Sequence, residues 1–321
     1  MGKYIIKRLF DLLPTVFVVA VIVFIITRLI PGNPAAVMLG PTASVEDIEK
    51  LTTQLGLDQP LYKQFLDYLL GLLQGDFGTS LSYNQPVAQL IMERFPNTVI
   101  LALAALVIAL LIGIPAGMIS AARQNSALDY GVMLVSLLGV SMPIFWLGVM
   151  LVLFFSVNLG WFPATGMGTL DDGLLSYIKH LILPSITLAT IPMATFARIT
   201  RSSMLEVISQ EYIKTARAKG VAEFWVISKH VLKNALTPIL TVLGMQISML
   251  LGGAVLTETI FSWPGMGRLI VDAIDKRDFV VVQGTVLFIA IIFVLVNLLV
   301  DILYKVVNPR VNYESSKGGG Q

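Results

Sequence analysis

The chain has 321 residues, of which 56% are hydrophobic and only 13% are charged, and its mean hydropathy is +0.81. This balance excludes an ordinary water-soluble globular domain and indicates an integral membrane protein. The basic residues behind the net charge of +2 cluster at the edges of apolar stretches, which argues against a nucleic-acid-binding face. The absence of cysteine excludes disulfide bonds and thiolate metal sites.

Six apolar stretches are long enough to cross the hydrocarbon core of a bilayer, which takes about 20 helical residues. We interpret the first stretch as an uncleaved anchor, because no small-x-small cleavage site follows it. The sequence therefore predicts an all-α, polytopic membrane protein with six transmembrane helices. They lie near residues 9–30, 98–121, 131–157, 181–199, 237–259 and 284–306.

Basic residues predict the orientation of these spans. Of the 22 Lys and Arg residues, 14 fall in the four segments that six spans place on one side of the membrane. Loops rich in Lys and Arg stay in the cytoplasm, so we expect both termini to be cytoplasmic. The predicted parts are an N-terminus with the first helix (1–30), a small extracytoplasmic helical domain (31–97), a five-helix core with a cytoplasmic loop at 198–236 (98–306), and a cytoplasmic tail (307–321).

The extracytoplasmic domain has signals for three short helices. Ser44 precedes two acidic residues and marks the start of the first helix, which Gly56 ends. A second helix begins at Pro60 and carries apolar residues on one face. A third begins at Pro86 and ends before Pro96. The apolar faces need a neighbour, which is the outer membrane surface, the helix bundle or an external partner.

Two turns outside the membrane combine glycine with aromatic residues, at 75–78 and at 261–267. The first is either an ordinary turn or part of a docking surface. The second is an anchor at the membrane interface or a hairpin that dips toward a cavity. The candidate residues for receptor docking or an outer gate are Asp76, Phe77, Trp263 and Pro264.

The predicted spans contain neutral polar residues instead of a proton or sodium relay. A proline in the third span leaves backbone groups that must be satisfied inside the protein, so it either shapes helix packing or lines a pore. Ser and Thr residues often serve helix packing alone. An amide in hydrocarbon is costly without a partner, which makes Gln246 a stronger candidate. The candidate residues of a translocation path are Ser141, Met142, Pro143, Gln246, Ser248 and Glu258.

Motifs for catalysis are missing from the sequence. It contains no phosphate-binding loop, no His-Glu-x-x-His and no Gly-x-Ser-x-Gly. The two histidines, His180 and His230, lie in loops on opposite sides of the membrane, too far apart to hold a metal. We therefore expect no catalytic residue, no metal site and no cofactor in this chain.

The most polar stretch of the chain runs from residue 211 to residue 238. Gly220 permits the left-handed turn that ends a helix, so we expect a helix over 201–219, a sharp turn and a second, amphipathic helix. The second helix places Phe224 and Trp225 on an apolar face together with Val221, Val231, Leu232 and Ala235. A basic loop on lipid headgroups explains the charges but not the two aromatic residues.

Residues 212–220 and 233–238 resemble the cytoplasmic coupling loop of ABC-importer permeases in the oligopeptide/dipeptide/nickel subfamily. The general pattern has Glu-Ala-Ala six residues before the glycine, whereas this chain has Lys214, Thr215 and Ala216, which is similar to the peptide-permease variant. The resemblance covers nearly the whole chain. Its further matches are at 31–34, 75–78, 141–146, 198–206, 257–265 and 307–310.

This resemblance implies a loop that couples the membrane spans to a separate ATPase, formed by Glu211, Tyr212, Lys214, Thr215, Ala216, Arg217, Ala218, Lys219 and Gly220. It also implies a location in a bacterial inner membrane. The implied partners are the lipid bilayer, a second homologous permease, two cytoplasmic ATPase subunits that bind ATP and Mg, and an extracytoplasmic substrate-binding protein.

The expected activity is alternating access that imports short peptides, without ATP hydrolysis by this chain. Nickel chelates, glutathione or another small solute are alternative cargoes. An ATP-independent channel or membrane scaffold is an alternative of another class, and it leaves the loop without a role. An integral membrane enzyme would need a charged constellation that the sequence lacks.

Overall fold

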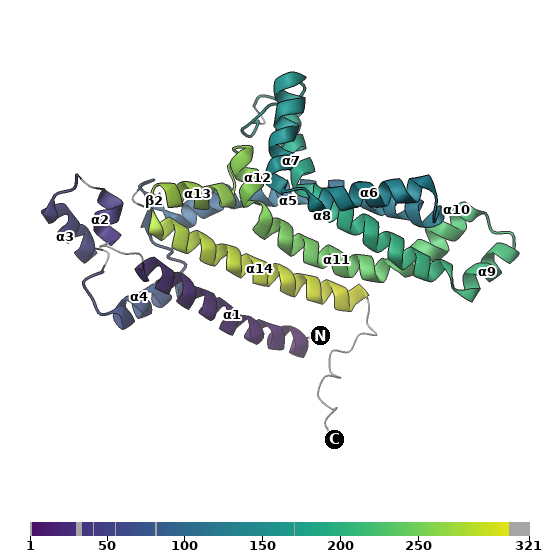
Figure 1. Ribbon diagram of the computed structural model, residues 1–321. Coiled ribbons are helices and arrows are strands. Elements are labelled where there is room, and N and C mark those ends of the chain that lie inside the picture. Colours follow the sequence, from purple (N-terminus) through teal and green to yellow (C-terminus); the bar gives the residue numbers. More distant parts are fainter. Residues whose placement is uncertain are drawn as a thin grey trace. The chain divides into compact units, whose positions relative to one another are not determined.

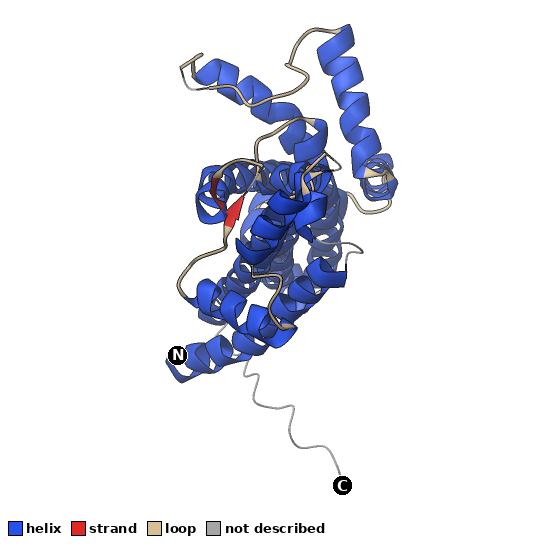
Figure 2. Ribbon diagram, turned by 90° about the vertical axis from the view of Figure 1, so that its left-hand side faces the viewer, coloured by secondary structure: helices blue, strands red, loops and turns tan. Residues whose placement is uncertain are grey.

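The computed structural model describes residues 2–29, 34–40, 42–54, 56–80, 82–169 and 171–307. Helices make up nearly all the regular structure of this part of the chain, with one short strand pair (Figure 2). The predicted all-α class is confirmed. The chain divides into two compact units, one of Met1–Val99 with Ser262–Val294 and the other of Ile100–Phe261 with Leu295–Gln321.

The first unit contains the N-terminal helices together with α13 (Met266–Asp275), which comes near the end of the chain. Ser44 caps α3, because its hydroxyl accepts the backbone N–H of Asp47 at 3.1 Å, and Gly56 lies beyond the end of α3 with φ +63°, as predicted. The elements are α1 (Gly2–Leu29), α2 (Pro34–Leu39), α3 (Val45–Gln54), α4 (Leu61–Leu73), β1 (Thr79–Ser80), β2 (Gln85–Pro86) and α13 (Met266–Asp275). The strands β1 and β2 are antiparallel.

The helix expected to end before Pro96 does not end there. It is the start of α5 (Val87–Ala122), which runs unbroken for 36 residues through the second predicted span. A proline inside a helix removes one hydrogen bond and strains the turn before it. Apolar packing offsets that cost, because Val87 and Ile91 are buried in one cluster with Met266 and Leu269 of α13.

The second unit is arranged around α8 (Leu174–Ile208), which contacts α6, α7, α11 and α12 (Figure 1). Two segments of this unit, η1 and η2, are π-helical. The remaining elements are α6 (Ala127–Ser141), α7 (Ile144–Leu151), η1 (Val152–Asn158), α9 (Glu211–Ala218), α10 (Glu223–Trp225), η2 (Val226–Val231), α11 (Leu232–Gly253) and α12 (Val255–Ile260). The last helix, α14 (Phe279–Val307), belongs to both units.

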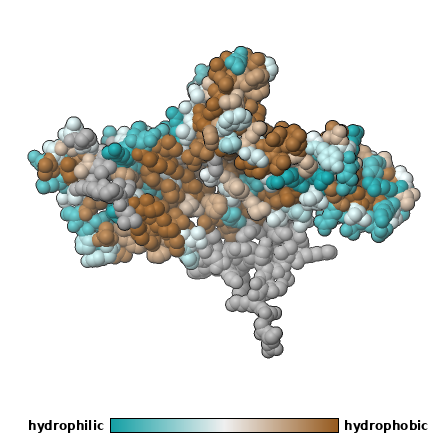
Figure 3. Space-filling view, in the orientation of Figure 1, coloured by the Kyte–Doolittle hydropathy of each residue, from teal (hydrophilic) through white to brown (hydrophobic). Residues whose placement is uncertain are grey.

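Four helices in the described part of the chain are long and apolar enough to cross a membrane. They are Val87–Ala122, Leu174–Ile208, Glu223–Gly252 and Phe279–Val300. A fifth candidate is the bent pair Ala127–Ser141 and Ile144–Asn158, and Leu13–Arg28 in α1 is a shorter apolar helix. Hydrophobic residues cover broad areas of the visible surface, as expected for helices that face lipid (Figure 3).

The third predicted span, 131–157, is broken instead of merely kinked. Its two halves meet at 104°. Met142 ends α6 in an extended conformation with ψ 132°, and Pro143 is extended as well. The cause is local, because a proline disfavours the helical region for the residue before it. Residues 31–33 and 308–321, which include part of two sequence motifs and most of the tail, lie outside the described residues.

Candidate coupling surface and translocation path

The polar stretch forms a short helix, a turn and a second helix. The predicted continuous helix over 201–219 is wrong, because α8 ends at Ile208 and α9 begins only at Glu211. Gln210 between them is extended, with ψ 144°. The Ser209 hydroxyl donates to the carbonyl of Glu206 at 2.7 Å, a local bond that favours the end of a helix.

The turn after α9 is the one predicted at Gly220. This glycine has φ +78°, and its N–H donates to the carbonyl of Arg217 at 2.9 Å. The next N–H, of Val221, donates to Ala216 at 3.3 Å. A Cβ at Gly220 would meet no described atom within 4 Å. The left-handed backbone, and not a lack of space, therefore favours glycine here.

An ion pair closes this turn. Two side-chain nitrogens of Arg217 donate to the carboxylate of Glu223. Nε donates to Oε2 at 3.0 Å, and Nη2 donates to Oε1 at 2.7 Å. The bond to Glu223 raises the pKa of Arg217 above its ordinary value. The pair joins α9 to α10 across Gly220 and so bridges the turn.

Buried residues attach α9 to the helices around it. Ile213 is fully buried and packs in one cluster with Met204 of α8, Val226 and Val231 of η2, and Ala235 of α11. This contact makes α9 an extension of the bundle instead of a loose loop. A force on α9 therefore reaches α8, η2 and α11.

The opposite face of α9 is open to a partner. Ala216 is half-buried, and the other residues that the sequence assigned to the coupling loop are exposed: Glu211, Tyr212, Lys214, Thr215, Arg217, Ala218, Lys219 and Gly220. The structure thus brings the predicted coupling residues together on one short, supported helix and the turn that follows it.

The apolar face expected for the second helix is wrong at two positions. Phe224 is 71% exposed and Trp225 is 56% exposed, whereas Val226 and Val231 are fully buried. The reason is η2, because its π-helical i→i+5 bonds change the register that a regular helix of 3.6 residues per turn would have. Periodicity read from the sequence assumes an α-helix throughout.

A buried ion pair beneath the loop was missed by the sequence reading. Asp129 at the start of α6 is 1% exposed and accepts two bonds from Arg201 of α8, at 2.6 and 2.8 Å. The Ser120 hydroxyl and the N–H of Asn125, at 2.9 Å, also donate to this carboxylate. The spacing of Ser126 and Asp129 is a helix-start signal that would have drawn attention to this position.

The six residues predicted for a translocation path lie in different surroundings. Gln246 and Ser248 are buried on α11, and the Ser248 hydroxyl donates to Oδ1 of Asn297 on α14 at 2.9 Å. Glu258 is fully buried on α12, while Ser141 and Pro143 are exposed. Their function as a path stays a prediction.

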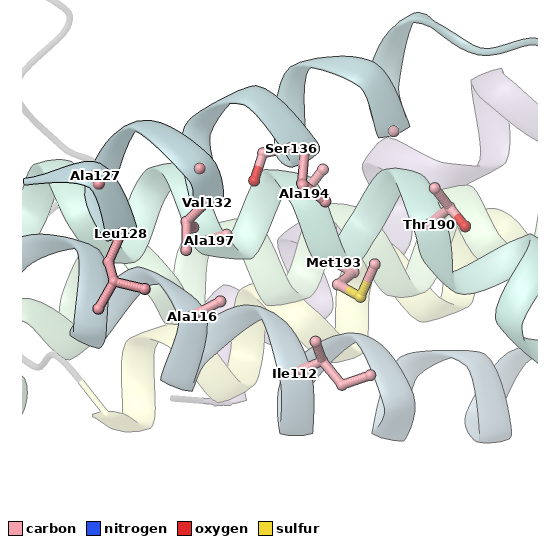
Figure 4. A pocket seen from close by; sticks show the side chains of 13 residues that line it. Ile112, Ala116, Ala127, Leu128, Val132, Ser136, Thr190, Met193, Ala194 and Ala197 are labelled. Carbon is pink, nitrogen blue, oxygen red and sulfur yellow. The ribbon is translucent and has the colours of Figure 1, made fainter.

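A cavity of about 390 Å³ lies elsewhere, between α5, α6 and α8 (Figure 4). It is lined mainly by small and apolar residues, with Ser136 and Thr190 as its hydroxyl groups. Ile112, Ala116, Leu128 and Met193 contribute apolar atoms (Figure 4). None of the six predicted path residues is among those that line it.

The two turns predicted to dock a receptor differ in how much of their side chains is exposed. Asp76 is exposed and accepts the N–H of Gly78 at 2.8 Å, and Phe77 is half-buried against Phe288. Trp263 is fully buried, and its indole N–H donates to the carbonyl of Asn97 at 2.9 Å. Trp263 is therefore an internal anchor in this structure and offers no surface to a receptor. The carbonyl of its neighbour Pro264, which is half-buried, accepts the Asn97 amide at 2.8 Å.

The described residues contain no group of three or more His, Asp or Glu that could hold a metal ion. What they do contain is a set of membrane-length helices and a short exposed helix fastened to three of the elements around it. These features define the class as a polytopic helical membrane protein with a short exposed helix beside its membrane-length helices.

Comparison with known proteins identifies the class further. Residues 113–313 match the family described as the binding-protein-dependent transport system inner membrane component, and residues 1–102 match the N-terminal region of such membrane components. The chain therefore belongs to this family, the permease subunits of ABC importers. It is a multi-pass protein of the bacterial inner membrane.

Relatives extend over nearly the whole chain. The dipeptide transport system permease protein DppB of Alkalihalophilus pseudofirmus is 47% identical over 333 residues, and the di/tripeptide permease DppB of Pseudomonas aeruginosa is 47% identical over 339. The glutathione permease GsiC of Escherichia coli K12 is 44% identical over 314 residues. Each alignment covers 98% of this chain and 100% of the relative.

A solved structure shares the fold. A chain of the MetNI methionine ABC transporter, in an inward-facing conformation, matches with a TM-score of 0.55. The match covers 68% of this chain and 97% of the other at 18% sequence identity. At this identity the likeness concerns the fold alone.

Proposed function

We propose that this permease subunit imports short peptides, and that it forms one half of a translocation path completed by a second, homologous permease. The 47% identity to two permeases named for dipeptides and for di- and tripeptides supports this cargo. The neutral character of the polar residues within the predicted spans supports it as well, since a peptide backbone is recognised by hydrogen bonds and not by a charge relay.

The exposed helix α9, fastened by the buried side chain of Ile213, is the observation that carries the coupling part of the proposal. A separate cytoplasmic ATPase subunit docks on its open face, from Glu211 to Gly220. Two such subunits bind ATP and Mg and hydrolyse ATP, and an extracytoplasmic protein delivers the peptide. The exposed Asp76 and its neighbour Phe77 belong to the surface on which that protein docks.

Rigid attachment explains how a movement of the ATPase reaches the spans. Ile213 joins α9 to α8, η2 and α11, and the Arg201–Asp129 ion pair joins α8 to the start of α6. Because packed helices move as bodies, displacement of α9 rotates these helices together. ATP can favour one access state only through such a differential contact.

The proposal includes six spans with both termini in the cytoplasm. The four full spans, the bent pair and the shorter helix of α1 supply six apolar segments. This topology places the polar stretch 211–238 on the same side as the termini, where the excess of Lys and Arg predicts it.

Glutathione is the second cargo that a specific observation favours, because GsiC is 44% identical over the same extent. It is itself a small peptide with two carboxylates, so a neutral path suits it when a receptor carries the specificity. Nickel chelates remain a third possibility by resemblance. A channel or scaffold without an ATPase leaves the supported helix α9 without a function.

Purification in mild detergent of the tagged chain from its own cells, with mass identification of what accompanies it, tests the proposal. A second permease and ATPase subunits with phosphate-binding loops are the expected companions. The ligand bound to the accompanying receptor identifies the cargo as a peptide, glutathione or a chelate. A stable assembly of this chain alone, with no ATPase, contradicts the proposal.

A further inference from the structure

We infer that Phe224 and Trp225 form a second anchor for the ATPase subunit, beside α9, an inference that rests on the proposed function. Their rings pack edge to face with centroids 5.3 Å apart and lie 71% and 56% exposed. Adjacent aromatic rings in water are energetically unfavourable, and aromatic residues of this kind dominate the binding energy of protein interfaces.

The length of the helix that follows decides between a lipid and a protein partner. The apolar helix Glu223–Gly252 has 30 residues, about 45 Å at 1.5 Å per residue, whereas hydrocarbon is about 30 Å thick. About 10 residues therefore lie outside the hydrocarbon. They are at the Glu223 end, because the polar residues of the helix are concentrated there: Ser228, Lys229, His230, Lys233 and Asn234.

Trp225 is too far from the hydrocarbon to belong to the aromatic belt of the membrane. Lys233 marks the cytoplasmic edge of the span, and Trp225 precedes it by 8 residues, about 10 Å of helix, because the six π-helical residues of η2 rise less per residue than an α-helix. A tilt of 40° reduces this to about 8 Å. The headgroup layer is only about 5–7 Å thick on each side. Both rings therefore lie beyond the headgroups, where only a protein can cover them.

The aromatic pair is continuous with the coupling surface. Glu223, the residue before Phe224, is bound to Arg217 of α9 at 2.7 Å, and η2 packs against α9. Exposed Lys219 and Lys229 flank the pair and make this surface positive. The chemistry of the partner follows from these groups: an apolar pocket with an acidic rim, on the same ATPase subunit that receives α9.

Thiol labelling in the complex tests this inference, since the chain has no cysteine of its own. Trp225→Cys and Lys214→Cys each supply a single thiol, the first in the aromatic pair and the second on α9. Both variants are assembled with the second permease and reconstituted in lipid, with and without the ATPase subunits. The mass of this chain alone shows how much of each thiol has reacted with a water-soluble maleimide. In a second set of samples, bimane is attached to the thiol, and quenching of its fluorescence by brominated lipid reports contact with the membrane.

We expect the ATPase to protect both thiols, and brominated lipid to leave bimane at position 225 unquenched. Protection at position 214 but not at 225 overturns the anchor and leaves the proposed function intact. Protection at neither position contradicts the proposed function as well. Quenching at 225 by brominated lipid assigns the pair to the membrane and overturns the inference.

A binding measurement gives the size of the contribution that the two rings make to ATPase binding. Phe224→Ser/Trp225→Ser removes an interface anchor, for which we expect about 30-fold weaker ATPase binding. Because both rings are exposed, the double variant keeps the fold, as its unchanged melting temperature should show. Trp161→Ser is the matched control, since Trp161 is 57% exposed but lies outside the loop. Equal binding by the double variant and this control overturns the inference.

Discussion

Arg201 and Asp129 form a two-point ion pair that joins α8 to the first turn of α6, with nitrogen–oxygen distances of 2.6 and 2.8 Å. The Asp129 side chain is 2% exposed and that of Arg201 is 25% exposed. Arg201 lies in the last turns of α8, shortly before the chain enters α9. The ion pair therefore attaches the end of α8 that precedes α9 to the turn between α5 and α6.

Arg201→Met should destabilise the permease by about 3 kcal/mol, because it leaves the carboxylate of Asp129 buried without its counter-charge. The melting temperature in detergent measures this loss. Arg201→Lys should recover only part of it, since an ammonium group cannot reproduce the two-point geometry. Arg198→Met is the control, because Arg198 is exposed on the same helix. Equal melting of the Arg201 and Arg198 variants would contradict this prediction.

Gly117 lies at a close contact between α5 and α8. A Cβ there would be 2.5 Å from the carbonyl oxygen of Ala197 and 2.6 Å from Cβ of Thr200. Gly117→Ala should therefore destabilise the protein by about 1–3 kcal/mol, despite the higher helix propensity of alanine. Gly131→Ala in α6 is the matched control, because its Cβ would meet no described atom within 4 Å. The prediction fails if both variants melt alike.

Gly220→Pro should abolish peptide uptake while the subunit remains inserted in the membrane. Proline cannot adopt φ +78° and loses the N–H that donates to Arg217. Gly220→Asn should retain most uptake, since asparagine tolerates the left-handed conformation. Uptake of labelled dipeptide, normalised to inserted protein, measures both. Normal uptake with proline would show that the turn is not needed.

Ala216→Asp should also stop uptake, for a different reason. Ala216 is half-buried beside the face that we assign to the ATPase, so a carboxylate there is desolvated when the subunit docks. Binding of the ATPase subunit should fall together with uptake, whereas the melting temperature of the isolated permease should change little. A loss of uptake with full ATPase binding would place the defect elsewhere.

Trp263→Phe should lower stability without changing receptor docking. The variant keeps an apolar ring but removes the bond from the indole N–H to the carbonyl of Asn97, a loss of about 1 kcal/mol. Thermal melting detects this change, and binding of the extracytoplasmic protein should stay the same because Trp263 is fully buried. Weaker receptor binding at unchanged stability would instead assign Trp263 to the docking surface.

Local chemistry explains which parts of the candidate site were predictable. Gly220 was recognised because a helix end followed by glycine has one common solution, the left-handed turn. The caps of α3 at Ser44 and Gly56 follow the same kind of rule. The break at Pro143 was located correctly, but its size was underestimated, since the sequence does not specify whether a proline bends a helix or ends it.

The sequence by itself determined the membrane character, the helical class and the left-handed turn at Gly220, because apolar length, charge distribution and turn residues act over a few neighbouring positions. Only the tertiary structure decided which side chains are open to a partner. The burial of Trp263, the exposure of Phe224 and Trp225, and the Arg201–Asp129 pair depend on contacts between segments far apart in the chain. Periodicity within one helix contains no information about such contacts.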